Sequence, residues 1–211
     1  MTESVRDQVL GKAGLLSPSC AVTSLTLGFI AAFRGWTVEK IASTPLMRHI
    51  GQNLIKIALG GLGLTGPIPD SIGDYCVHLE WIYLSGNKGI TGPIPENWSN
   101  LRKLRKIDLE ATGISGPIPV NLFSGATALR SIELSRTQIS GEIPPNIGQL
   151  THLTRFIVMS APLSGKIPKT MINLKKLQHL DLTNTGIIQP EGATTMLHKT
   201  PDACSMFLTL L

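Results

Sequence analysis

Six residues near the start of the regular part of the chain match a nucleotide-binding pattern. Gly61-Leu62-Gly63-Leu64-Thr65-Gly66 fits G-x-G-x-x-G and follows a segment with strand character. In dinucleotide-binding folds this turn opens a helix whose amino terminus holds the pyrophosphate. Here Pro67-Ile68-Pro69 comes next, and two prolines this close together exclude that helix. The hexapeptide therefore does not predict a nucleotide site.

Residue types that ligate metals or act as nucleophiles are present but widely scattered. The five histidines have no second ligand at metal spacing, and no cysteine stands in a C-x-x-C pair. The sequence contains no G-x-S-x-G segment, no kinase motif set and no Ser-His-Asp arrangement. We therefore expect no metal, no cofactor and no enzymatic activity. These residues are His49, His78, His152, His179, His198, Cys20, Cys76 and Cys204.

One modification signal is present. Asn97-Trp98-Ser99 is an acceptor sequence for N-linked glycan, usable only if the chain enters the secretory pathway. A glycan on Asn97 is accordingly an expectation that depends on localisation.

Two motifs recur along the chain with the same period. The segment G-x-I-P begins at Gly66, Gly92, Gly116, Gly141 and Gly165, in steps of 26, 24, 25 and 24 residues. A pattern of the form L-x-x-[LIF]-x-[LV] begins at Leu54, Leu79, Leu104, Leu129, Leu153 and Leu177, in steps of 25, 25, 25, 24 and 24. A fixed period of this length predicts a solenoid, in which each repeat forms one coil.

The repeat has a direct physical interpretation. In each coil a short strand sends its leucines to one side, and coils stacked about 4.8 Å apart join them into one core. In the third coil we expect Leu104, Ile107 and Leu109 to point inward, with Ile114, Ile118 and Leu122 filling the rest. The glycine permits a close turn, and the prolines favour an extended, polyproline-like path. The polar stretch after each G-x-I-P predicts a short 3₁₀ or single-turn helix.

Over about 54–190 these motifs resemble the plant-specific class of leucine-rich repeats. The stretch from Ile139 to Leu150, ISGEIPPNIGQL, follows the class pattern almost letter for letter. The resemblance implies an α/β repeat solenoid, a right-handed curved array with a concave parallel β-sheet and a 3₁₀ and polyproline-like convex side. Proteins of this class include receptor-kinase ectodomains and polygalacturonase-inhibiting proteins, which bind peptides, proteins or cell-wall components. It therefore implies recognition rather than chemistry.

The chain departs from the class at the ladder position, where an asparagine normally bonds the neighbouring coil. Only Asn87 remains, and the other coils carry Thr112, Thr137, Ala161 and Thr185. Threonine offers fewer hydrogen bonds than asparagine and alanine offers none, so we expect the fifth coil to be less well satisfied. The threonines also resemble those of protozoan leucine-rich repeat surface antigens.

Both ends of the chain leave the repeat pattern. Residues 1–53 are interpreted either as a degenerate capping coil, with Val22–Leu27 as its strand, or as a leader, because 13–33 carries no charge. The usual C-x-W-x-G-V-x-C cap is missing from this part. Residues 54–190 form the solenoid of about six coils, and 191–211 form a terminal cap or a truncated tail.

Composition narrows the classes of partner. Aromatic residues make up 5% and charged residues 16% of the chain, and the formal charge is +5 without any long basic run. Nothing here indicates nucleic-acid binding.

The positions of the strand that alternate with the leucines should form columns on the sheet surface. One column is basic at its edge and another is acidic in its middle, and Trp81 and Tyr83 add aromatic area of the kind that forms binding hot spots. We expect a partner to bind at Trp81, Tyr83, Arg105, Lys106, Asp108, Glu110, Arg130, Glu133, Arg155 and Asp181.

These observations favour macromolecular recognition of a protein or peptide ligand, or of a polysaccharide, at the cell surface or outside the cell. The alternatives are a secreted inhibitor of a cell-wall hydrolase, a non-catalytic fragment of a longer receptor, or an intracellular scaffold. Membrane association is expected only through a missing or N-terminal segment.

Overall fold

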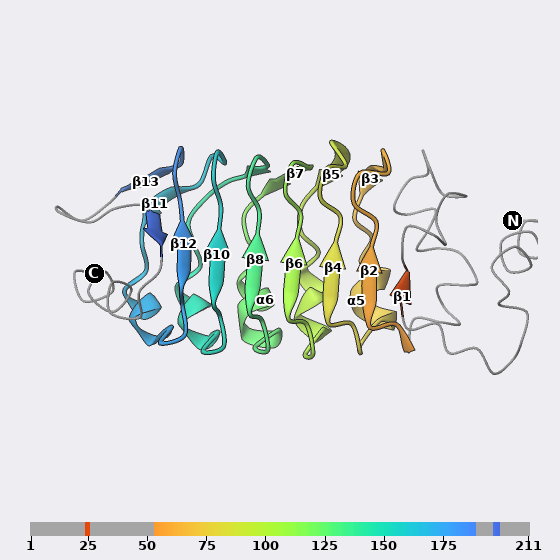
Figure 1. Cartoon of the computed structure of the whole chain (residues 1–211), viewed down its shortest axis with the longest axis horizontal. Helices are drawn as coiled ribbons and strands as arrows, with labels where there is room; N and C mark the ends of the chain where they lie inside the picture. Colours follow the sequence, from red (N-terminus) through yellow and green to blue (C-terminus); the bar gives the residue numbers. More distant parts are fainter. Residues whose placement is uncertain (1–23, 26–52, 189–195, 199–211) are drawn as a thin grey trace, which may run out of the picture.

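The computed structural model describes residues 24–25, 53–188 and 196–198, with side chains in 53–188. One long sheet of eight strands runs the length of this part, in the order β1-β2-β4-β6-β8-β10-β12-β14 (Figure 1). Neighbouring strands are parallel except at the end, where β14 pairs antiparallel with β12. The strands are β1 Ser24–Leu25, β2 Lys56–Ala58, β4 Trp81–Tyr83, β6 Lys106–Asp108, β8 Ser131–Glu133, β10 Arg155–Ile157, β12 His179–Asp181 and β14 Met196–His198.

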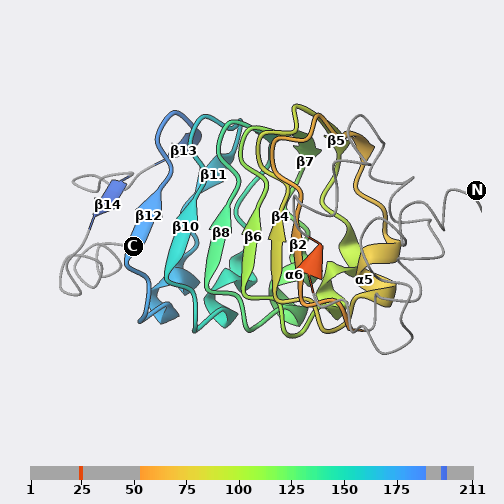
Figure 2. The same ribbon diagram turned by 45° about the vertical axis from the view of Figure 1, so that its right-hand side comes forward.

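The G-x-I-P side of the coils carries further strands. They form a four-stranded sheet, β3-β5-β7-β9, and a two-stranded sheet, β11-β13, which lie behind the long sheet (Figure 2). The glycine of every G-x-I-P has φ between 76° and 84°, a conformation that L-residues with a Cβ adopt only at a cost. The strands are β3 Thr65–Pro67, β5 Gly89–Gly92, β7 Gly113–Gly116, β9 Gln138–Ile139, β11 Ser164–Lys166 and β13 Gly186–Ile188.

A short helical turn follows each G-x-I-P, as predicted. These turns lie along one edge of the molecule (Figure 1) and stack on one another. The packing is close: a Cβ on Gly73 would lie 2.4 Å from the carbonyl oxygen of Asn97, and one on Gly148 equally close to that of Thr170. The turns are α5 Ser71–Tyr75, η3 Glu96–Asn100, α6 Val120–Gly125, η4 Pro145–Gln149 and η5 Lys169–Asn173.

The interior is the expected column of aliphatic side chains. In the third coil Leu104, Ile107 and Leu109 are fully buried, and so are Ile114 and its successors toward the helical turn. Burying each such side chain stabilises the fold by roughly 1.5–3 kcal/mol. Because the leucines of one coil are covered only by those of the next, the core is continuous along the solenoid. The predicted fold class is therefore confirmed.

The ladder position divides the coils into two kinds. Asn87 is fully buried and bonds two coils: its amide nitrogen donates to the carbonyls of Leu59 and Leu84, and its oxygen accepts from the N–H groups of Leu62 and Leu64. The threonines instead donate within their own coil. The hydroxyls of Thr112, Thr137 and Thr185 bond the carbonyls of Leu109, Leu134 and Leu182, each at 2.7 Å. The buried Ala161 adds no such bond.

Short strands extend the long sheet at both ends. β1 lies within the segment 22–27 that we interpreted as a coil strand, and it pairs in parallel with β2. β14 lies within the terminal segment 191–211. The remainder of both segments, including the leader alternative and Cys20 and Cys204, lies outside the described residues, so the domain boundaries stay predictions. In the described part no helix has the length and apolar character needed to cross a membrane.

Candidate recognition surface

The outward side chains of the long sheet form the rows that the sequence predicted, and we call this surface the sheet face. The pairing register aligns equivalent residues of successive strands. The row at the strand starts is Lys56, Trp81, Lys106, Ser131, Arg155 and His179, and the row at the strand ends is Ala58, Tyr83, Asp108, Glu133, Ile157 and Asp181.

Two aromatic side chains lie side by side on β4, flanked by lysines. The ammonium groups of Lys56 and Lys106 lie 5.2 and 5.1 Å from the centroid of the Tyr83 ring. Trp81 is in register between the same two lysines and, like Tyr83, is only half-buried. Attraction between an ammonium and an aromatic ring holds such side chains in place, so this end of the sheet face is apolar and positively charged.

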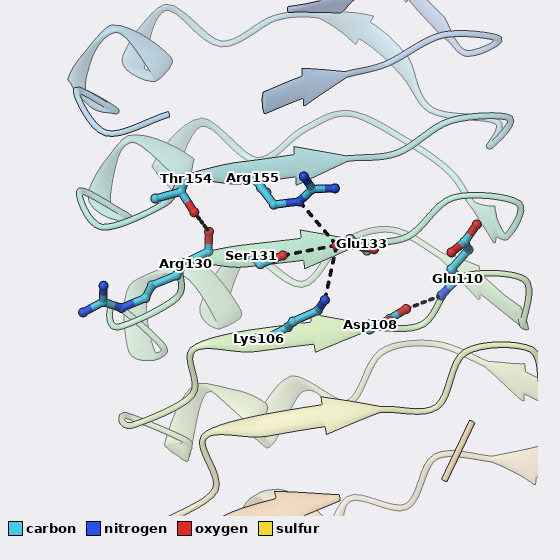
Figure 3. Close-up of polar contacts among 8 residues, drawn as sticks. All are labelled: Lys106, Asp108, Glu110, Arg130, Ser131, Glu133, Thr154 and Arg155. Atoms are coloured by element: carbon cyan, nitrogen blue, oxygen red, sulfur yellow. Dashed lines mark hydrogen bonds and ion pairs between the residues drawn. The ribbon is translucent and has the colours of Figure 1, made fainter. Parts of the chain in front are cut away.

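Glu133 is the centre of an ion-pair cluster. Its Oε1 lies 3.4 Å from Lys106 Nζ and 3.5 Å from Arg155 Nε, and it accepts a hydrogen bond from the Ser131 hydroxyl at 3.4 Å (Figure 3). The sequence placed the basic and acidic residues in separate columns. The structure joins the columns, because these long basic side chains reach the neighbouring strands.

Two further ion pairs use residues that sequence reasoning missed. Arg105 Nε lies 3.2 Å from Glu80 Oε2, and Arg136 pairs with Glu110. Glu80 and Arg136 were not among the expected residues. Their spacing could have found them, since Glu80 and Arg105 are 25 residues apart and Glu110 and Arg136 are 26, each close to one repeat.

Two aspartates of the strand-end row turn to the backbone. Asp108 accepts a hydrogen bond from the N–H of Glu110 at 3.3 Å, and Asp181 accepts one from Thr183 at 3.0 Å. Asp181 is 5% exposed, so its carboxylate mainly stabilises the turn after β12.

Burial is the main factor that raises the pKa of Asp108. The charges of Glu133 and Glu110 raise it further, while the Glu110 N–H and Lys106 oppose the rise. The carboxylate oxygens of Asp108, Glu110 and Glu133 lie within 4.8 Å of one another. The cations bound to Glu133 and Glu110 offset part of this negative charge.

Comparisons with known proteins agree with this geometry. A family model described as Leucine Rich Repeat matches residues 78–101 and 128–150. The BIR2 ectodomain from Arabidopsis thaliana is 31% identical, with 67% of this chain and 72% of that chain covered and a TM-score of 0.58. The chain belongs to the leucine-rich repeat family.

Longer leucine-rich repeat structures also match. One is the ectodomain of the Arabidopsis thaliana plant membrane receptor kinase GASSHO1/SCHENGEN3 in complex with CASPARIAN STRIP INTEGRITY FACTOR 2, at 25% identity and a TM-score of 0.64. Another is the Arabidopsis receptor kinase HAESA in complex with the peptide hormone IDA and the co-receptor SERK1, at 25% identity and a TM-score of 0.65. Each match covers 72% of this chain but only 17% and 24% of those chains. No curated protein sequence matches.

The glycosylation candidate Asn97 lies on η3, on the helical side of this leucine-rich repeat array. Its Nδ2, the atom to which a glycan would be attached, donates to the Asp70 carbonyl at 2.5 Å and to Asp74 Oδ1 at 2.9 Å. Asn146 bridges its preceding coil in the same way, to the Val120 carbonyl. Because a glycosylated Nδ2 retains a single N–H, a glycan here would cost one of the two bonds to the preceding coil.

Proposed function

We propose that the protein is a recognition module that binds a peptide or protein ligand on the sheet face. The observation that carries this proposal is the half-exposed pair Trp81 and Tyr83, held in register between Lys56 and Lys106. Interfaces place such rigid aromatic side chains at their energetic centre, because they contribute large apolar area with little loss of conformational freedom.

The rest of the proposed surface follows from the ion pairs around β6, β8 and β10. Residues already fixed by these pairs lose little conformational entropy when a ligand arrives. The HAESA complex supports a peptide as ligand, since a similar array there is seen with a peptide hormone. The proposed contact residues are Trp81, Tyr83, Arg105, Lys106, Asp108, Glu110, Arg130, Glu133 and Arg155, with the buried Asp181 in a supporting role.

The test is selection from a random peptide library on the immobilised protein, followed by affinity measurement on the selected peptides. We expect the double variant Trp81→Ala, Tyr83→Ala to weaken binding about 30-fold, as loss of a hot spot does. Tyr75→Ala is the matched control, because Tyr75 is an exposed aromatic residue on α5, away from the sheet face. Unchanged binding by the double variant, or an equal loss with Tyr75→Ala, would overturn the proposed surface.

We also propose that the protein acts at the cell surface or outside the cell, since the ectodomains to which it is similar belong to plant receptors. The amino-terminal sequence and glycan mass of the protein from its native cells test this location. A processed amino terminus would support it, and an unmodified Met1 in the cytosol would exclude it.

A further inference from the structure

The cations of the sheet face differ in whether they are already neutralised. Arg105 pairs with Glu80, while Lys106 and Arg155 share Glu133. Lys56 contacts the Tyr83 ring but no carboxylate, and Arg130 forms no ion pair within residues 53–188. In Figure 3 the Arg130 guanidinium points away from Glu133. Lys56 and Arg130 can therefore accept an anionic group without losing an existing ion pair.

The acidic side chains of the same surface offer less to a ligand. Glu80, Glu110 and Glu133 are each bound to at least one cation, and Asp181 is buried against the N–H of Thr183. A basic ligand would have to displace these contacts. The uncompensated charge on the sheet face thus favours an acidic ligand.

The two unpaired cations also have a defined separation. Lys56 is on β2 and Arg130 immediately precedes β8, which are three strand steps apart in the sheet order. At about 4.8 Å per step this is roughly 14 Å, the length of about four residues of extended peptide. β4, with Trp81 and Tyr83, lies between them, one step from β2.

We infer that the ligand is an extended acidic peptide that crosses the strands, with one carboxylate on Lys56 and a second, about four residues further along, on Arg130. Between them an apolar side chain packs on Trp81 and Tyr83. This inference rests on the proposed recognition function and specifies the chemistry and spacing of its ligand.

A series of synthetic peptides tests the spacing. Each peptide carries one leucine and two glutamates in a glycine-serine background, and the glutamates are separated by two, four, six or eight positions. Net charge is the same throughout, so only spacing differs. We expect the tightest binding at the separation of about four and weaker binding on either side. Affinity that does not depend on spacing would overturn the inference.

Variants test the two cations. Lys56→Gln and Arg130→Gln should each weaken the best peptide about threefold, the size of an exposed ion pair, and more so at low salt. Lys88→Gln is the control, since Lys88 is exposed, lies outside the sheet-face rows and changes the net charge equally. An equal loss with Lys88→Gln would show general charge attraction and overturn the inference.

The two proposals fail in different ways. Library peptides that require Trp81 and Tyr83 but carry no acidic pair would overturn the acidic-peptide inference and leave the recognition function standing. Binding that ignores the aromatic pair would overturn the proposed surface itself.

Discussion

Asp108 lies at the point where the fold brings three carboxylates together. Burial and the charges of Glu110 and Glu133 disfavour its ionised form and raise its pKa above the ordinary value. A raised pKa means that the folded protein binds the proton more tightly than the unfolded chain does. The ionised Asp108 therefore costs stability at neutral pH, and this cost disappears as pH falls through the folded pKa toward the unfolded one.

The variant Asp108→Asn should accordingly unfold at a higher temperature than the parent protein at pH 7. Its side-chain oxygen can still accept the Glu110 N–H, so the turn is kept. The advantage should shrink as the pH is lowered toward 4, because the parent then protonates Asp108. Thermal unfolding at several pH values measures this. Asp70→Asn, at an exposed position, is the charge-matched control. An advantage that does not change with pH would contradict the assignment.

At this scale the sequence predicted positions better than interactions. Alternation along each strand placed Trp81 and Tyr83 on the surface, and the period placed Lys56 and Lys106 beside them. The ion pairs were not predicted, because they depend on how long side chains bend across about 4.8 Å between strands. Glu80 and Arg136 were missed for that reason.

Among the elements, the loop after each strand of the long sheet shows how single residues hold a coil. The residue before the ladder position has φ between 52° and 56° in four coils, at Ala111, Arg136, Ser160 and Asn184. L-residues reach this left-handed region only at a cost of roughly 1–2 kcal/mol each. In the coil that carries Asn87 the same position is Gly86, which adopts it without strain.

Asn87 and the threonines should therefore differ sharply in their contribution to stability. Asn87→Ala leaves four buried backbone groups in two coils without partners, at a cost of about 4 kcal/mol. Thr112→Val keeps the shape and removes one bond within one coil, at a cost of about 1 kcal/mol. Denaturant unfolding of both variants measures the difference. Equal losses would mean that water replaces the asparagine without penalty.

The sequence predicted the strands, turns and helical segments of the coils, but not the additional sheets. Segments such as Thr65–Pro67 and Gly113–Gly116 contain glycine and proline, which disfavour strands. They pair because neighbouring coils hold them in register, a consequence of the stacking and not of local preference.

Along the whole molecule, stability should be distributed coil by coil. Each coil contacts chiefly its neighbours, through the long sheet, the G-x-I-P strands and the stacked helical turns. In such an array the free energy of unfolding is a sum of coil terms and nearest-neighbour terms. The period, and not the total length, is then what the chain must preserve.

Deleting residues 104–128 removes one 25-residue step and joins Lys103 to Leu129, so every later leucine keeps its place in the repeat. β4 would then pair with β8, and Tyr83 would face Glu133 where it now faces Asp108. We expect this variant to fold, with a denaturant m-value lower by roughly a sixth, because it buries one coil less of about six.

Deleting only 104–115, about half a coil, provides the contrast. It places Gly116-Pro117 where a strand of the long sheet should run and interrupts the leucine column. This shorter deletion should abolish cooperative unfolding although it removes fewer residues. If the full-coil deletion were equally unable to fold, stability would have to depend on particular contacts of β6 and α6 and not on the repeating stack.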